Sequence, residues 1–105
     1  MTDTLTHEAL GEHLGTKFEV QLEPDKILEL ELTEISKLKK SERHEQFSIV
    51  FLGPNDILLE QGIHQMKHDT FGECELFIVP ISQDDRGCRY EAVFNRLRGS
   101  NEASV

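Results

Sequence analysis

The stretch Leu28-Glu29-Leu30-Glu31-Leu32-Thr33 decides the fold class of this chain. Apolar and polar residues alternate along it, and successive side chains of a β-strand point to opposite faces of a sheet. The leucines therefore predict a strand with one buried face, and the glutamates predict a solvent-facing side, as in an antiparallel sheet with one wet face.

The same alternation precedes this strand. Phe18, Val20 and Leu22 point one way, between polar residues that point the other way. Pro24-Asp25 then separates the two strands, and this pair is typical of a turn because proline presets its own backbone angle.

A short helix is predicted at the N-terminus, over residues 6–14. Thr6 can cap it, and Leu5 and Leu10 occupy the two positions of a hydrophobic staple around that cap. Gly15 suits the left-handed position just past the end of a helix.

Two later runs, 47–52 and 75–79, are apolar enough to predict strands buried on both faces, and Pro80 is expected to end the second run. A polar loop at 82–87 and a last strand at 88–97 follow. The segment 57–68 stays open between helix and strand.

These patterns together predict a mainly β fold, namely a small antiparallel barrel or sandwich of five to six strands with a short N-terminal helix. At 105 residues the chain has room for one domain. We expect this domain over residues 1–97 and a disordered tail over 98–105.

The charge balance excludes whole classes of partner. Acidic residues outnumber basic ones 20 to 11, and the formal net charge is −9. A nucleic-acid binder must neutralise phosphates with Lys and Arg, so neither nucleic acid nor an anionic membrane is an expected partner. The one basic cluster is interpreted as a solvated loop; it consists of Lys37, Lys39, Lys40 and Arg43.

Cys74 and Cys88 do not make a disulfide framework. If the last two strands form a hairpin, Cys74 lies near Phe94 or Asn95 and far from Cys88, so we expect no bond between the two cysteines. Residues 1–4 lack the basic and apolar regions of a secretion signal, and the expected compartment is a reducing cytoplasm.

Metal binding is a hypothesis that rests on His64, His68 and Glu73. On a helix the two histidines would stand side by side, whereas on a strand they would be about 13 Å apart. Zinc ligands lie only about 2.0–2.2 Å from the ion, so the strand would need a bulge to bring them together. No cofactor is expected.

Two segments resemble an uncharacterised family of small bacterial proteins. These are Phe-Ser-x-x-Phe-x-Gly-Pro at 47–54 and Tyr-Glu-Ala-Val-Phe-Asn at 90–95, with Gln-Gly and Glu-Leu-Phe-x-Val-Pro between them. The chain departs from the family at His64, where an aromatic such as Tyr is expected, and at Cys74, where a larger apolar residue is expected. The resemblance implies no established activity, and only a loose association with genes for tail-fibre-like collar proteins.

The resemblance also singles out polar residues embedded in apolar strands. A connected network of such groups could fix strand register or line a pocket. The residues are Gln61, His68, Glu75, Glu91 and Asn95.

The leading hypothesis is a non-enzymatic accessory or protein-interaction module. It would bind a protein partner or a copy of itself, by strand pairing across an exposed edge. One alternative is a small metal-dependent enzyme or binding protein that uses His64, His68 and Glu73. The other is a small-molecule-binding barrel; its cavity would be lined by Phe47, Phe51, Phe77 and Tyr90.

Overall fold

The computed structural model describes residues 5–97, so the tail predicted at 98–105 lies outside the described residues. The protein is mainly β, with 64% of the described residues in strands. The elements are α1 (His7–Gly11), β1 (Lys17–Glu23), β2 (Lys26–Ile35), β3 (Lys39–Lys40), β4 (His44–Gly53), β5 (Gly62–His68), β6 (Gly72–Asp84) and β7 (Gly87–Leu97).

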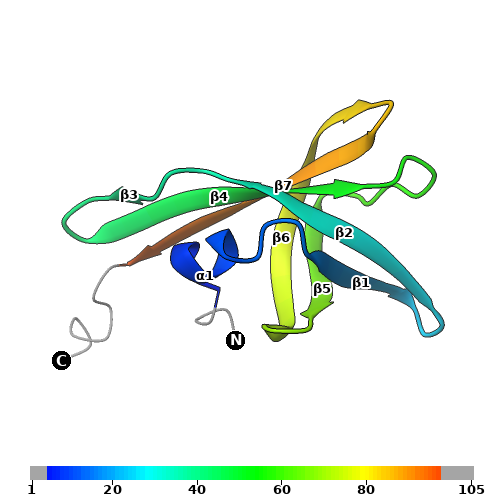
Figure 1. The fold of residues 1–105 in the computed structure, drawn as a ribbon, viewed down its shortest axis with the longest axis horizontal. Helices are drawn as coiled ribbons and strands as arrows, with labels where there is room; N and C mark the ends of the chain where they lie inside the picture. The colour runs from blue at the N-terminus through cyan, green and yellow to red at the C-terminus, as the bar shows by residue number, and fades with distance from the viewer. Residues whose placement is uncertain (1–4, 98–105) are drawn as a thin grey trace.

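The strands form one antiparallel sheet in the order β2-β1-β5-β6-β7-β4-β3 (Figure 1). An additional pairing of β2 with β4 closes six of the strands into a barrel, and β3 is left as an extra strand beside β4. The predicted fold class is therefore confirmed, and the structure selects the barrel over the sandwich.

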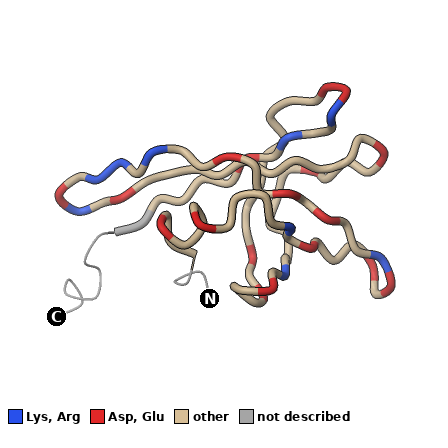
Figure 2. Tube along the Cα trace, in the orientation of Figure 1, with Lys and Arg blue, Asp and Glu red and all other residues tan. Residues whose placement is uncertain are grey.

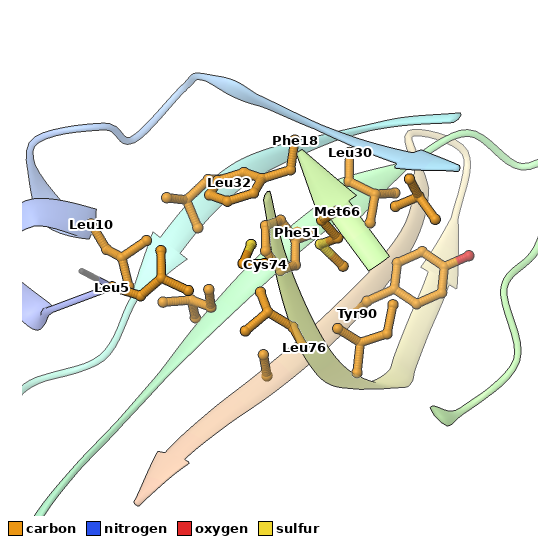
Figure 3. Packing of buried hydrophobic residues seen from close by; sticks show 14 of the residues in the cluster. Leu5, Leu10, Phe18, Leu30, Leu32, Phe51, Met66, Cys74, Leu76 and Tyr90 are labelled. Atoms are coloured by element: carbon orange, nitrogen blue, oxygen red, sulfur yellow. The ribbon is translucent and has the colours of Figure 1, made fainter. Parts of the chain in front are cut away.

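The alternating strands lie as the sequence predicts. Phe18 pairs with Leu30 and Val20 with Leu28, and all four side chains are buried. Phe51 and Tyr90 pair in the same way across β4 and β7. These side chains fill the barrel interior (Figure 3).

The open question over residues 57–68 is settled in favour of a strand. β5 covers Gly62–His68 and pairs with β6 along its whole length, from Gly62 opposite Ile78 to His68 opposite Gly72. The first part of this segment, residues 57–61, forms neither helix nor strand.

The helix is shorter than the predicted 6–14. It spans His7–Gly11, and residues 12–15 continue as turns. Its start follows the prediction, because the Thr6 hydroxyl accepts a hydrogen bond from the Ala9 backbone N–H at 3.1 Å. Leu5 and Leu10 are both fully buried, and the helix packs chiefly against β2. In the described part of the chain, no helix is long and apolar enough to cross a membrane.

The prediction of a run buried on both faces at 75–79 is wrong. Leu76 and Ile78 point into the barrel, but Glu75 and Phe77 lie on the outer face and are exposed. The outer face of a barrel wall needs a second layer to bury it, and no described element covers this part of β6.

Pro80 does not end the strand as expected. β6 continues to Asp84, and the register with β7 shifts between Pro80 and Ser82. The register skips Ile81, so the bulge lies directly after Pro80, and bulges are among the few places where a strand tolerates proline. The loop predicted at 82–87 is accordingly reduced to a tight turn between Asp84 and Gly87.

β6 changes its neighbour halfway along. Residues 72–78 pair with β5, whereas the pairing with β7 runs only from Val79 opposite Glu91 to Asp84 opposite Gly87. β7 pairs with β4 as far as Leu97, so its second half diverges from β6. Cys74 therefore lies opposite Met66 of β5 instead of near Phe94 or Asn95, and both cysteines are free.

Candidate functional site

The outer face of the β5–β6 hairpin carries two large apolar side chains. Ile63 and Phe77 lie directly opposite each other in the register and are 68% and 51% exposed. Side chains of directly paired residues in an antiparallel sheet lie in contact distance. The pair therefore makes a small apolar surface on a strongly acidic protein.

Polar residues continue the same face beyond this pair. The Gln65 side chain lies opposite Glu75, and its amide donates to a carboxylate oxygen of Glu75 at 3.2 Å. Lys67 and Glu73 form the next pair in the register. The apolar surface thus has a polar border on one side.

Within residues 5–97, one edge of β6 has no strand beside it along residues 72–78. In the described part of the chain, residues 72–78 pair through their backbone with β5 alone. Alternate residues of a strand direct their N–H and C=O groups to opposite sides, so about half of these groups point toward the space between β6 and β7. Such an edge can accept an added strand.

His68 is the buried polar residue at the other end of β5, and it is 5% exposed. Its Nδ1 accepts hydrogen bonds from the backbone N–H groups of Thr70 at 2.9 Å and Phe71 at 3.4 Å. The Thr16 hydroxyl donates to the His13 carbonyl at 2.6 Å, so it accepts from Nε2–H of His68 at 2.9 Å. These contacts require a neutral ring with its proton on Nε2.

The surroundings of His68 lower its pKa. Burial is the largest cause, since the ring packs between Phe18 and Phe71 at centroid distances of 4.5 and 4.8 Å. The neighbouring His13 ring, 5.4 Å away, acts in the same direction, and the Asp69 carboxylate acts against it. His68 is thus a turn-capping group inside the structure, closed off from outside ligands.

The five polar residues that the sequence singles out are not brought into one buried cluster. His68 is buried, Glu91 is partly exposed on the outer face of β7, and Gln61, Glu75 and Asn95 are exposed. Glu75 is joined to Gln65, as described above, and His68 to Thr16 and the β5–β6 turn.

The metal candidates are also kept apart. His64 and His68 lie four residues apart on one strand, which separates their backbones by about 13 Å. The His64 Nε2 lies 2.8 Å from the Glu60 carbonyl oxygen, and Glu73 is exposed beyond the turn. Within residues 5–97, no group of three or more His, Cys, Asp or Glu side chains is arranged to hold a metal ion.

The four aromatic residues expected to line a ligand cavity do not lie around a common space. Phe47, Phe51 and Tyr90 belong to the packed core, and Phe77 points away from it. Within this core the Tyr90 hydroxyl accepts a hydrogen bond from the Leu59 backbone N–H at 2.9 Å. Burial raises the pKa of this tyrosine, which fits a structural role.

An open groove of about 590 Å³ lies on the outside of the barrel, along β1, β2 and the end of β4. Three carboxylates line it, from Glu19, Glu29 and Glu31, together with the cationic Lys17 and Arg86. Because both signs of charge occur in it, the groove favours no single class of charged ligand.

Sequence reasoning missed Ile63 and Phe77 as surface residues, although the signal was present. Glu73 and Glu75 mark the wet face of β6, and Phe77 follows them at the same two-residue period. The contacts of His68 could not be predicted in this way. Thr16 and His13 lie far from His68 in the sequence, and only the folded chain brings them beside it.

Comparison with known proteins leaves the function open. No curated protein and no solved structure gives a significant match to the chain. A family described as a domain of unknown function matches residues 5–94, which span α1, the strands β1 to β6 and β7 as far as Phe94. The chain therefore belongs to the DUF6916 family of domains of unknown function.

Proposed function

We propose that this domain is a non-enzymatic protein-interaction module whose recognition surface is the outer face of the β5–β6 hairpin. The observation that carries the proposal is the exposed pair of Ile63 and Phe77. Large apolar side chains that lie together on an otherwise acidic surface are typical of interaction sites.

The chemistry around the pair indicates the kind of partner. Glu73 and Glu75 lie on the same face, and the whole chain carries a net charge of −9. A partner surface with an apolar centre and basic residues beside it would match both features. The partner is thus a protein with a basic, partly apolar patch.

An accessory role in tail-fibre-like assemblies extends this proposal, and its support is the sequence resemblance alone. A reducing, cytoplasmic setting is part of the same proposal. It is supported by the two free cysteines, Cys74 and Cys88, both of which are buried without a bond between them.

The test is affinity capture from the native host with the wild-type domain and with the variant Ile63→Thr/Phe77→Thr. Both side chains are more than half exposed, so the variant should fold and melt close to the wild type. We expect a protein that the wild type retains and the variant loses, with at least about a tenfold difference in affinity between the purified components by calorimetry.

Ile27→Thr is the matched control, because Ile27 is 54% exposed at the other end of the barrel wall, on β2. It should bind the partner as the wild type does. A partner that binds the Ile63→Thr/Phe77→Thr variant with undiminished affinity would show that this face is not the recognition surface.

A further inference from the structure

Several strand edges lie without a strand neighbour in the described part of the chain, and two of them have opposite charge. The first is the edge of β6 at residues 72–78, which faces the diverging half of β7. The outward side chains along it include Glu73 and Glu75, and the inward ones are Cys74, Leu76 and Ile78.

The second edge belongs to β3 and the residues just before it. β3 is the last strand of the sheet order, and β4 is its one strand neighbour in the described part of the chain. Ser36 also pairs with β4, since its N–H donates to the Ser48 carbonyl at 2.8 Å. Residues 36–40 therefore run along β4 and present their other side outward.

We call residues 36–47 the arm, because this hairpin projects from the barrel (Figure 1). Its charge differs from that of the rest of the molecule. Figure 2 shows lysines and an arginine gathered at the arm, where they outnumber the acidic residues Glu42 and Glu45, whereas acidic residues prevail over the chain as a whole. Along its free edge, exposed Lys37 and Lys39 alternate with the partly buried Leu38.

The two edges have matching patterns. Lys37-Leu38-Lys39 is basic, apolar, basic, and Glu73-Cys74-Glu75 is acidic, apolar, acidic. In an antiparallel pairing that places Leu38 opposite Cys74, each lysine lies opposite a glutamate. Opposite charges directly across a strand pair are favourable and like charges are unfavourable. Two β6 edges would bring glutamates together, so the pattern selects the arm over a second β6.

We propose that copies of this chain associate head to tail, with the arm of one copy adding as a strand to the free β6 edge of the next. The arm and the β6 edge are different surfaces, so each copy keeps one of them unused after a pairing. Such a heterologous contact builds a ring or an open filament. The inference goes beyond the outer-face partner proposed above and does not require it.

Charge reversal tests the pairing. The measurement is sedimentation velocity over a range of protein concentrations at low ionic strength, where charge attraction is little screened. The wild type should form species that grow with concentration. Lys37→Glu/Lys39→Glu and Glu73→Lys/Glu75→Lys should each weaken association by about tenfold or more, and the variant with all four changes should recover it.

Two controls separate this contact from other causes. Asp56→Lys/Asp85→Lys changes the net charge as much as the β6 variant but alters exposed residues away from both edges, so it should associate as the wild type does. Ile63→Thr should also associate normally, because it changes the outer face of β5 and leaves the β6 edge intact. Circular dichroism and thermal melting would establish that each variant is folded.

Amide hydrogen exchange supplies the backbone readout. Association by strand addition should protect amides within residues 36–40 and 72–78, since new backbone hydrogen bonds form there. Protection confined to other segments would overturn the proposal.

Two results of the sedimentation experiment would contradict the proposal. A wild type that stays monomeric at every concentration, or a folded four-change variant that fails to recover association, would overturn the head-to-tail contact. If the wild type stays monomeric but binds a synthetic peptide with the sequence of residues 35–41, the β6 edge accepts a separate strand of this sequence. The proposed association between whole copies of the chain is then wrong.

Discussion

The imidazole of His68 connects three parts of the chain. Its Nδ1 accepts from the turn between β5 and β6, its Nε2–H reaches Thr16 at the start of β1, and its ring packs on Phe18. Protonation would place a proton on Nδ1, where two backbone N–H groups already point. The folded state therefore favours the neutral ring.

This preference predicts how stability depends on pH. Burial and the nearby His13 lower the pKa of His68 in the folded state, against an ordinary value of 6.5, and Asp69 opposes them in part. As pH falls, His68 therefore binds a proton in the unfolded chain before it does so in the folded one. The contribution of neutral His68 to the free energy of unfolding is fully present above about pH 6.5 and is lost progressively below it. Urea unfolding of the wild type between pH 8 and pH 5 measures this slope.

His68→Asn is the matched variant, because its amide oxygen is attached at the same Cγ as Nδ1 and does not titrate. The wild type should lose more stability than this variant between pH 7 and pH 5. At pH 8, His68→Ala should cost about 1–3 kcal/mol, since the turn N–H groups lose their acceptor. Parallel pH profiles for the wild type and His68→Asn would show that His68 does not titrate as proposed.

At the scale of single elements, the sequence predicted β1 and β2 well, because polar and apolar residues alternate along both. β1 and β2 alternate throughout, and their buried faces are those expected. β6 was harder, because Phe77 and Val79 made it look apolar on both faces. Its length, its bulge and its change of neighbour depend on where β5 and β7 lie, and no local pattern encodes that.

The β6–β7 hairpin depends on one glycine. Gly87 is buried at a φ of +146°, and a Cβ there would lie 2.1 Å from the Gly53 carbonyl oxygen of β4. We expect Gly87→Ala to lower the free energy of unfolding by about 3 kcal/mol or more, because backbone strain adds to a clash between two paired strands. Chemical denaturation measures the loss.

Gly72 provides the comparison within the same sheet. Its φ is +73°, but a Cβ there would meet nothing within 4 Å. Gly72→Ala should therefore show the strain alone, about 1–2 kcal/mol. Equal losses for Gly72→Ala and Gly87→Ala would mean that β4 moves aside readily and that the close approach at Gly53 is unimportant.

At the scale of the whole molecule, closure of the barrel brings together what the sequence separates. β2 pairs with β4, and β1 meets β5 through the two pairs Glu19–Lys67 and Val20–Met66. The sequence could predict a barrel or a sandwich, but the free β6 edge follows from the point at which β7 leaves β6 and continues beside β4. For Phe77 the two-residue period from Glu73 and Glu75 already indicated the outer face, whereas the place of Ile63 opposite Phe77 depends on the pairing of β5 with β6.

The net charge of −9 sets how the whole domain responds to salt. Glu19 lies directly opposite Glu29, and the ion pairs within residues 5–97 are limited to Lys17–Glu29 at 3.9 Å and Arg89–Asp84 at 2.9 Å. Exposed pairs contribute little, so repulsion among carboxylates dominates and screening should relieve it.

We expect sodium chloride to raise the melting temperature of dilute, monomeric protein while it weakens head-to-tail association. A gain of about 1 kcal/mol corresponds to about 4–8 °C in a domain of this size. A melting temperature that falls with salt would show that attractive pairs prevail over repulsion. If association also strengthened with salt, the contact between copies would rest on apolar burial, and the complementary charges of the arm and the β6 edge would not be its cause.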